Sequence, residues 1–178
     1  YLWPLLIVLF SGLLPGERVR LGHVVGALVS FAGAALIVSG GGLSAEGSAL
    51  GYGLAGLCAL FWSGYSVISR RLGATPTASV AVFCIATAAL SALVHLAVED
   101  TVWPVSRVGW AAVLGLGLGP VGLAFYVWDI GVKRGDIQLP GPASYAAPLL
   151  STLVLTVSGL AAPSWCRLLA ARLIAEGA

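Results

Sequence analysis

Apolar residues occur along this chain in seven long runs, separated by short segments that hold most of the charges and helix-breaking residues. A helix needs about 20 apolar residues to cross the hydrocarbon core of a bilayer, and most of the runs approach that length. None of them alternates apolar and polar residues over ten positions, as a strand of a membrane β-barrel does. The pattern therefore predicts an all-α membrane protein with seven spanning helices, over residues 1–14, 21–39, 48–69, 75–98, 108–128, 142–160 and 164–178.

The composition supports a protein that lies in the bilayer. Hydrophobic residues make up 59% of the chain and charged residues 9%, with a mean hydropathy of +1.00, whereas soluble domains have roughly 25% charged residues. The net charge of +2 is too small for a nucleic-acid-binding surface, so we expect no nucleic-acid partner. No span contains a nucleophile with a base, paired carboxylates or a metal-ligand cluster. We therefore expect no enzymatic activity, catalytic residue, metal or cofactor.

The loop charges predict an orientation. Six Lys and Arg residues lie in three alternate loops, 15–20, 70–74 and 129–141, and the intervening loops hold Arg107 alone before the last run. The positive-inside rule places the three basic loops in the cytoplasm, and the C-terminus on the same side. Three tryptophans near the ends of the runs are typical of residues at the membrane–water interface, and these are Trp103, Trp110 and Trp128.

Two parts of the chain repeat each other. Residues 1–34 align without gaps on residues 145–178, and both copies begin with the pattern Tyr-x-x-Pro-Leu-Leu. The first and sixth runs are five spans apart, so the two copies cross the membrane in opposite directions. Inverted repeats of this kind are typical of secondary transporters. A five-span unit repeated twice has ten helices, and we expect three of them to precede Tyr1.

Several stretches resemble the EamA repeats of the drug/metabolite transporter superfamily, whose members have ten helices. They are Tyr1–Leu6, Pro15–Arg18 with Gly26–Val38, Ala59–Tyr65 and Tyr145–Leu150. The resemblance implies an inverted-repeat helical bundle in which residues 1–39 end the first repeat and residues 48–178 form the second. The chain would then provide helices four to ten. Its Tyr-Leu-Trp-Pro start is most similar to the bacterial aromatic amino acid exporters.

This resemblance implies a secondary transporter that exports aromatic or apolar amino acids by alternating access, as a multi-pass protein of the bacterial inner membrane. Its partners would be the lipid bilayer and a small-molecule substrate, and we expect a monomer. The alternatives are a transporter of another small metabolite or drug in the same superfamily, or a non-transporting helical scaffold. Two features depart from the family pattern. The second copy lacks the Gly-Glu turn of the first, and Arg172 and Glu176 lie in the last run.

Aromatic residues and prolines supply the candidate substrate-binding residues. A proline inside a helix frees a backbone carbonyl, which a membrane tolerates at a cavity or at a contact with a neighbouring helix. Trp62 and Tyr65 share one helix face with Ser66 and Ser69, which favours either a substrate path or contact between helices. With the resemblance included, we expect the substrate to contact Tyr1, Trp3, Pro4, Trp62, Tyr65, Tyr145 and Pro148.

Charged residues are absent from the centres of the first six runs, and Asp129 and Asp136 flank Lys133 in what the pattern predicts to be a solvated loop. Proton-coupled carriers usually keep an ionisable group at membrane depth. The sequence therefore predicts transport without proton coupling in this part of the protein, and surface positions for both aspartates.

Overall fold

The computed structural model describes residues 1–38, 48–159 and 165–177, and these residues form helices and no strand. The helices are α1 (Trp3–Ser11), α2 (Leu21–Val38), α3 (Ala49–Arg71), α4 (Ser79–Val98), α5 (Arg107–Leu118), the π-helix η1 (Gly119–Leu123), α6 (Ala124–Arg134), α7 (Pro140–Ser144), α8 (Ala146–Val157) and α9 (Trp165–Gly177). Three helical spans are long and apolar enough to cross a membrane, over residues 49–71, 79–98 and 107–134. The all-α membrane class is confirmed.

Helix-breaking residues divide two of the predicted runs. In the fifth run, α5 and α6 are joined by η1, which has Pro120 at its start. Proline cannot donate the backbone hydrogen bond of a regular helix, and a π-helical turn is one way to accommodate it. In the sixth run, α7 ends at Ser144, and α8 begins at Ala146 with Tyr145 between them. Both breaks adjoin the residues of the candidate site.

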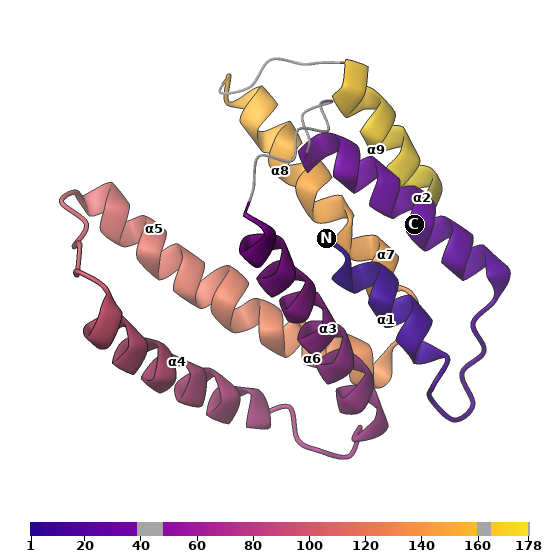
Figure 1. Cartoon of the computed structure of the whole chain (residues 1–178), viewed down its shortest axis with the longest axis horizontal. Helices are drawn as coiled ribbons and strands as arrows, with labels where there is room; N and C mark the ends of the chain where they lie inside the picture. Colours follow the sequence, from indigo (N-terminus) through magenta and orange to yellow (C-terminus); the bar gives the residue numbers. More distant parts are fainter. Residues whose placement is uncertain (39–47, 160–164, 178) are drawn as a thin grey trace.

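The repeat-related helices α2 and α9 lie side by side and antiparallel (Figure 1). The Ser30 hydroxyl donates to the Ile174 carbonyl at 3.5 Å, Gly26 faces Gly177 and Gly33 faces Ala170. The repeat alignment pairs position 26 with 170 and position 33 with 177. Exchanging each residue of the Gly26–Gly177 contact for its partner in the alignment therefore gives the Gly33–Ala170 contact. The packing of this pair therefore has the two-fold symmetry of an inverted repeat.

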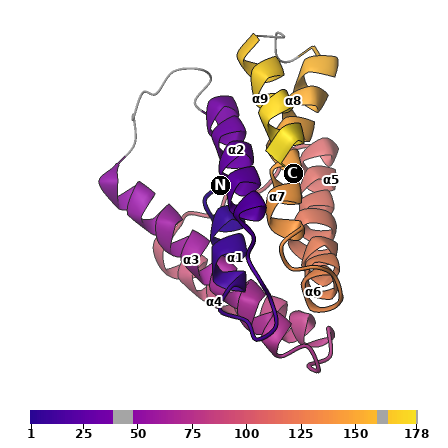
Figure 2. The same cartoon turned by 90° about the vertical axis from the view of Figure 1, so that its right-hand side faces the viewer.

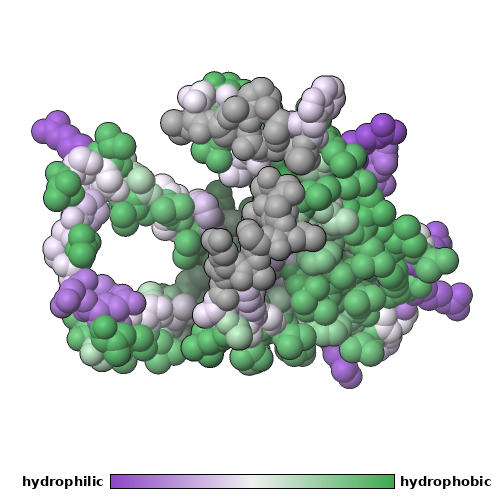
Figure 3. All heavy atoms as spheres, turned by 45° about the horizontal axis from the view of Figure 1, so that its top comes forward, coloured by the Kyte–Doolittle hydropathy of each residue, from purple (hydrophilic) through white to green (hydrophobic). Residues whose placement is uncertain are grey.

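Helix α1 lies at the centre of the described bundle. Figure 2 shows it between α3 on one side and α7 on the other, and it packs against both of them and against α2. The hairpin of α4 and α5 extends away from this centre (Figure 1). A space-filling view shows a hollow enclosed by the hairpin and a surface that is mostly apolar (Figure 3). Large apolar side chains are exposed along both helices, as expected for helices that face lipid.

One arginine gathers the three basic loops at a single end of the bundle. Arg70, at the end of α3, forms an ion pair with Glu17 of the α1–α2 loop at 3.0 Å. Its other terminal nitrogen donates to the carbonyls of Val132, Lys133 and Gly135 at 3.2, 2.8 and 2.7 Å. The three loops that share positive charge therefore lie together, as their charges predict. Their cytoplasmic location stays a prediction.

Candidate functional site

Five aromatic side chains from three helices meet where α1, α3 and α6 come together. We call them the aromatic cluster: Trp3 on α1, Trp62 and Tyr65 on α3, and Phe125 and Trp128 on α6. Trp62 is central, with ring centroids 6.3 Å from Trp3, 5.5 Å from Tyr65, 5.2 Å from Phe125 and 5.6 Å from Trp128. Both the α3 pair and the α6 pair are three residues apart, so each pair shares a helix face.

Trp128 belongs to this cluster, and its predicted depth at the membrane surface stays a prediction. Its ring is half-buried, with its centroid 5.3 Å from that of Trp3. The indole nitrogen donates to the Ser66 hydroxyl at 3.0 Å, and Ser66 donates to the Trp62 carbonyl at 2.9 Å. A tryptophan in a helix is placed at the interface or in the interior by its neighbours, and the helix continues here to Arg134.

A hydroxyl on α3 also positions Trp3. The Ser63 hydroxyl is buried and lies 2.9 Å from the Trp3 carbonyl and 2.7 Å from the Ala59 carbonyl. The start of α1 is therefore attached to the middle of α3, beside the aromatic cluster.

A cavity of about 580 Å³ lies on one side of the cluster, between α3, α4 and the α5–α6 span. We call it the α4 cavity. Six of its residues form one face of α4, and they are Val80, Phe83, Cys84, Thr87, Ala88 and Ser91; the others are Trp62, Tyr65, Val121 and Phe125. Its walls are apolar and aromatic, with a few hydroxyl groups, which is typical of small-molecule sites.

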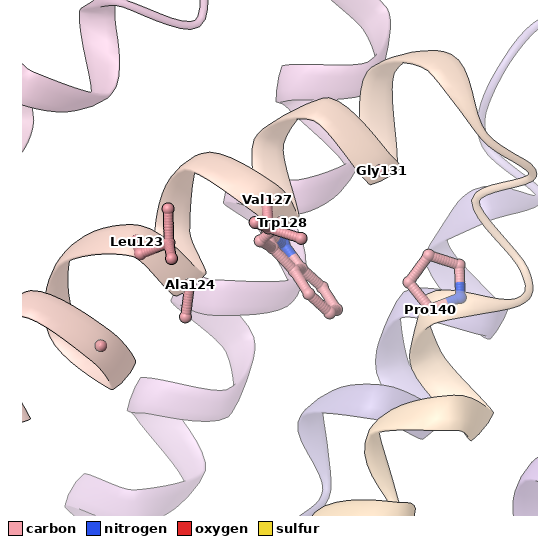
Figure 4. Close-up of a pocket in the computed structure, with 7 residues that line it drawn as sticks. Leu123, Ala124, Val127, Trp128, Gly131 and Pro140 are labelled. Carbon is pink, nitrogen blue, oxygen red and sulfur yellow. The ribbon is translucent and has the colours of Figure 1, made fainter.

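A second cavity, of about 520 Å³, lies on the other side of α6 and is closed at its far side by the start of α7. It is lined by Gly119, Leu123, Ala124, Val127, Trp128, Gly131 and Pro140. Figure 4 shows the indole ring of Trp128 projecting from α6 toward Pro140. Trp128 is the only polar-atom-bearing side chain among these seven residues, so this α6–α7 cavity offers apolar contact and one indole face.

A buried ion pair lies directly below the cluster, and the expected surface position of Asp129 is wrong. The Asp129 carboxylate is 2.8 Å from the Lys133 ammonium, and these side chains are only 2% and 6% exposed. Ser69 donates to the carboxylate at 2.7 Å and the Tyr65 hydroxyl at 3.5 Å, while Lys133 also donates to the Thr75 carbonyl at 2.9 Å. The pair lies just beyond the predicted fifth run, in the last turns of the helical span 107–134.

The other predicted substrate-binding residues lie together where α1 meets α7 and α8. Tyr145 is fully buried, and its hydroxyl donates to the Tyr1 carbonyl at 3.0 Å. Pro4 and Pro148 are buried as well. Gly141 approaches Pro4 so closely that a Cβ there would lie 2.7 Å from the Pro4 carbonyl oxygen. These four residues form helix contacts and line neither cavity, and their role in binding stays a prediction.

The sequence interpretation missed the α4 face. Phe83, Thr87 and Ser91 recur every four residues in an otherwise apolar helix, which places them on one face. That spacing was the available signal. Within the described ranges, no group of three or more His, Cys, Asp and Glu side chains is placed to hold a metal ion.

Comparison with known proteins assigns the chain to a family. Residues 49–177 match the EamA-like transporter family. The chain belongs to that family. With its membrane-length apolar helices, this EamA-like protein is a multi-pass membrane protein.

Relatives of this EamA-like chain include exporters. It is 57% identical to the aromatic amino acid exporter YddG of Ancylobacter novellus, with 100% of this chain and 63% of that protein covered. It is 27% identical to the protein of the same name from Salmonella typhimurium, over 85% of this chain and 54% of that one. A crystal structure matches with a TM-score of 0.92 and 57% identity, over 99% of this chain and 62% of the other. The chain thus spans less than two thirds of the length of these relatives.

Proposed function

We propose that the protein exports aromatic amino acids across the bacterial inner membrane by alternating access. In this proposal residues 1–39 and 48–178 belong to two inverted repeats, and the aromatic cluster with its two cavities forms part of the substrate path. The observation that carries the proposal is the cluster itself, which brings Trp3 together with Trp62 and Trp128. The relatives named as aromatic amino acid exporters support the same substrate class.

The geometry suits an aromatic side chain with a polar end. Contacts between aromatic rings contribute about 0.5–1.5 kcal/mol each beyond area burial, and the centroid distances around Trp62 lie in the range of such contacts. The α4 cavity, at about 580 Å³, falls within the roughly 300–1,000 Å³ of ligand sites. The hydroxyls of Tyr65, Thr87 and Ser91 provide hydrogen-bonding partners for an amino or carboxylate group.

We also propose that export runs down the substrate gradient without proton coupling. The sequence argument used the absence of central charges, whereas the structural argument uses the pairing of Asp129. Asp129 lies within the membrane-spanning segment, but Lys133 and Ser69 already occupy its carboxylate. A carboxylate that exchanges protons during transport needs a state in which it is accessible and unpaired. The paired arrangement favours a structural role for Asp129.

The proposal is tested with the full-length protein reconstituted in liposomes loaded with labelled tryptophan or labelled alanine. We expect tryptophan efflux to exceed alanine efflux. Tryptophan efflux should also be the same with and without a pH difference across the membrane. Trp62→Ala removes the central ring and should reduce tryptophan efflux about tenfold or more, whereas Trp62→Phe should retain much of it. Absence of tryptophan efflux contradicts the proposal. Preference for another metabolite or drug would replace the substrate class.

A further inference from the structure

We propose that Glu17 and Arg70, together with an apolar cluster behind them, form a gate between the two repeats at the cytoplasmic end. This inference rests on the proposed alternating-access function, because a gate is the contact that must separate when the substrate path opens at that end. Glu17 follows α1 in the first repeat, and Arg70 ends α3 in the second. Their ion pair is therefore a bond between the parts that move relative to each other.

Arg70 is suited to this role by the number of its contacts. A guanidinium carries five N–H donors in a planar fork, and Arg70 uses them on the Glu17 carboxylate at 3.0 Å and on carbonyls at the end of α6. The last carbonyls of a helix have no partner within the helix and carry partial negative charge. One side chain thus links the α1–α2 loop to the ends of α3 and α6.

Four apolar side chains close the space behind the ion pair, and we call them the apolar plug. Ile7 and Leu14 come from the first repeat, and Val132 and Ile137 come from the second. Their exposed fractions range from 0% to 7%. Val132 joins the two layers, because its carbonyl accepts from Arg70 while its side chain packs in the plug. Substrate cannot pass between the repeats here unless the plug separates.

The ion pair is placed to open readily. The two side chains are 25% and 24% exposed, and partly exposed pairs contribute modestly to stability because solvent screens them. A contact of this strength can hold a closed state and still break in each cycle. Removing the pair should shift the equilibrium between closed and open states by up to about fivefold.

The acidic residue of the gate occurs in only one of the two repeats. The repeat alignment places Ala161 opposite Glu17, and position 161 lies outside the described residues. The second repeat therefore has no carboxylate at the position that corresponds to Glu17. An ion pair at one end only stabilises the state that is closed at that end, so we expect this state to predominate when no substrate is bound.

Labelling of a buried thiol tests the gate without requiring transport. Val132→Cys places a thiol inside the plug with a small change of volume, in full-length protein whose other cysteines are replaced by serine. The labelling rate with N-ethylmaleimide is measured in lipid nanodiscs. We expect slow labelling with the intact ion pair and labelling up to about fivefold faster with Glu17→Gln. Arg70→Gln also loses the carbonyl contacts, and labelling should then be about fivefold or more faster. Arg70→Lys retains the charge without the fork and should give an intermediate rate.

Arg71→Gln is the matched control, because it removes the same charge from the next position. Arg71 is exposed, and in the described part of the chain no hydrogen bond or ion pair involves it. Labelling should stay at the parent rate in this variant, and the melting temperature is recorded for all of them. Equal rates in the parent, Glu17→Gln and Arg70→Gln overturn the gate, even if tryptophan efflux is normal. Faster labelling in a protein that exports no tryptophan supports the gate and refutes the proposed substrate.

Discussion

Two of the i,i+4 ion pairs among the described residues have nearly the same length but opposite burial, and this difference predicts a large contrast in stability. Asp129 and Lys133 are 2.8 Å apart and almost fully buried. Arg172 and Glu176 are 2.7 Å apart, with side chains that are 77% and 55% exposed. We expect Asp129→Asn to destabilise the protein strongly and Glu176→Gln to have a smaller effect.

The magnitude follows from the contacts of the buried pair. Removing one partner leaves a charged group without compensation in a low-dielectric site, which costs about 3–5 kcal/mol. Lys133 keeps the Thr75 carbonyl as an acceptor, and asparagine still accepts from Ser69, so the lower figure of about 3 kcal/mol applies to Asp129→Asn. The double variant Asp129→Asn with Lys133→Gln removes both charges. It should be less destabilised than Asp129→Asn alone.

The assay is the free energy of unfolding of full-length protein in mixed micelles, measured by denaturant titration with tryptophan fluorescence as the signal. The double variant provides the cycle that separates loss of the pair from loss of one residue. The reasoning is refuted if Asp129→Asn and Glu176→Gln change the unfolding free energy equally. It is also refuted if the double variant is less stable than Asp129→Asn.

Three further results are expected. Trp3→Ala removes two ring contacts from the aromatic cluster and should lower tryptophan efflux about tenfold. Trp110→Ala should leave efflux unchanged at equal protein amount. Normal efflux in Trp3→Ala would exclude the cluster from the substrate path. Gly26→Ala would place a Cβ 2.6 Å from the Gly177 carbonyl oxygen and should destabilise the protein by about 1–3 kcal/mol, while Gly22→Ala, with no atom within 4 Å, should not destabilise it in the same unfolding assay. A thiol introduced by Arg71→Cys should react with an impermeant maleimide from the cytoplasmic side only, and labelling from outside would reverse the orientation.

Much of the helical architecture could be predicted from the sequence, because spanning a bilayer requires long apolar helices and places charges in the loops. Helix α2 begins at Leu21, as predicted, and the described residues of the predicted run 21–39 are all helical. The bend at Pro120 follows from the missing N–H of proline. The internal repeat relates α2 to α9 in sequence, but their contact was seen only in the structure.

The candidate site depended on information that a single run does not contain. Trp128 and Asp129 are adjacent near a run end, where a belt tryptophan and a surface aspartate are the common outcome. Their actual surroundings come from α1 and α3, which contribute Trp3, Ser66 and Ser69. Only residues distant in sequence decide whether such side chains meet solvent or one another.

The sequence by itself determined the membrane class, the helical runs, the location of three basic loops on one side and the repeated segments. Each of these follows from local hydropathy, charge or internal similarity. The tertiary structure decided which side chains face a cavity, which ion pair is buried and which arginine links the α1–α2 loop to the end of α6. Glu17 and Arg70 are 53 positions apart, and no periodicity within a helix relates them. Their contact exists because α1 and α3 pack side by side and end together, which brings a loop carboxylate within reach of a guanidinium.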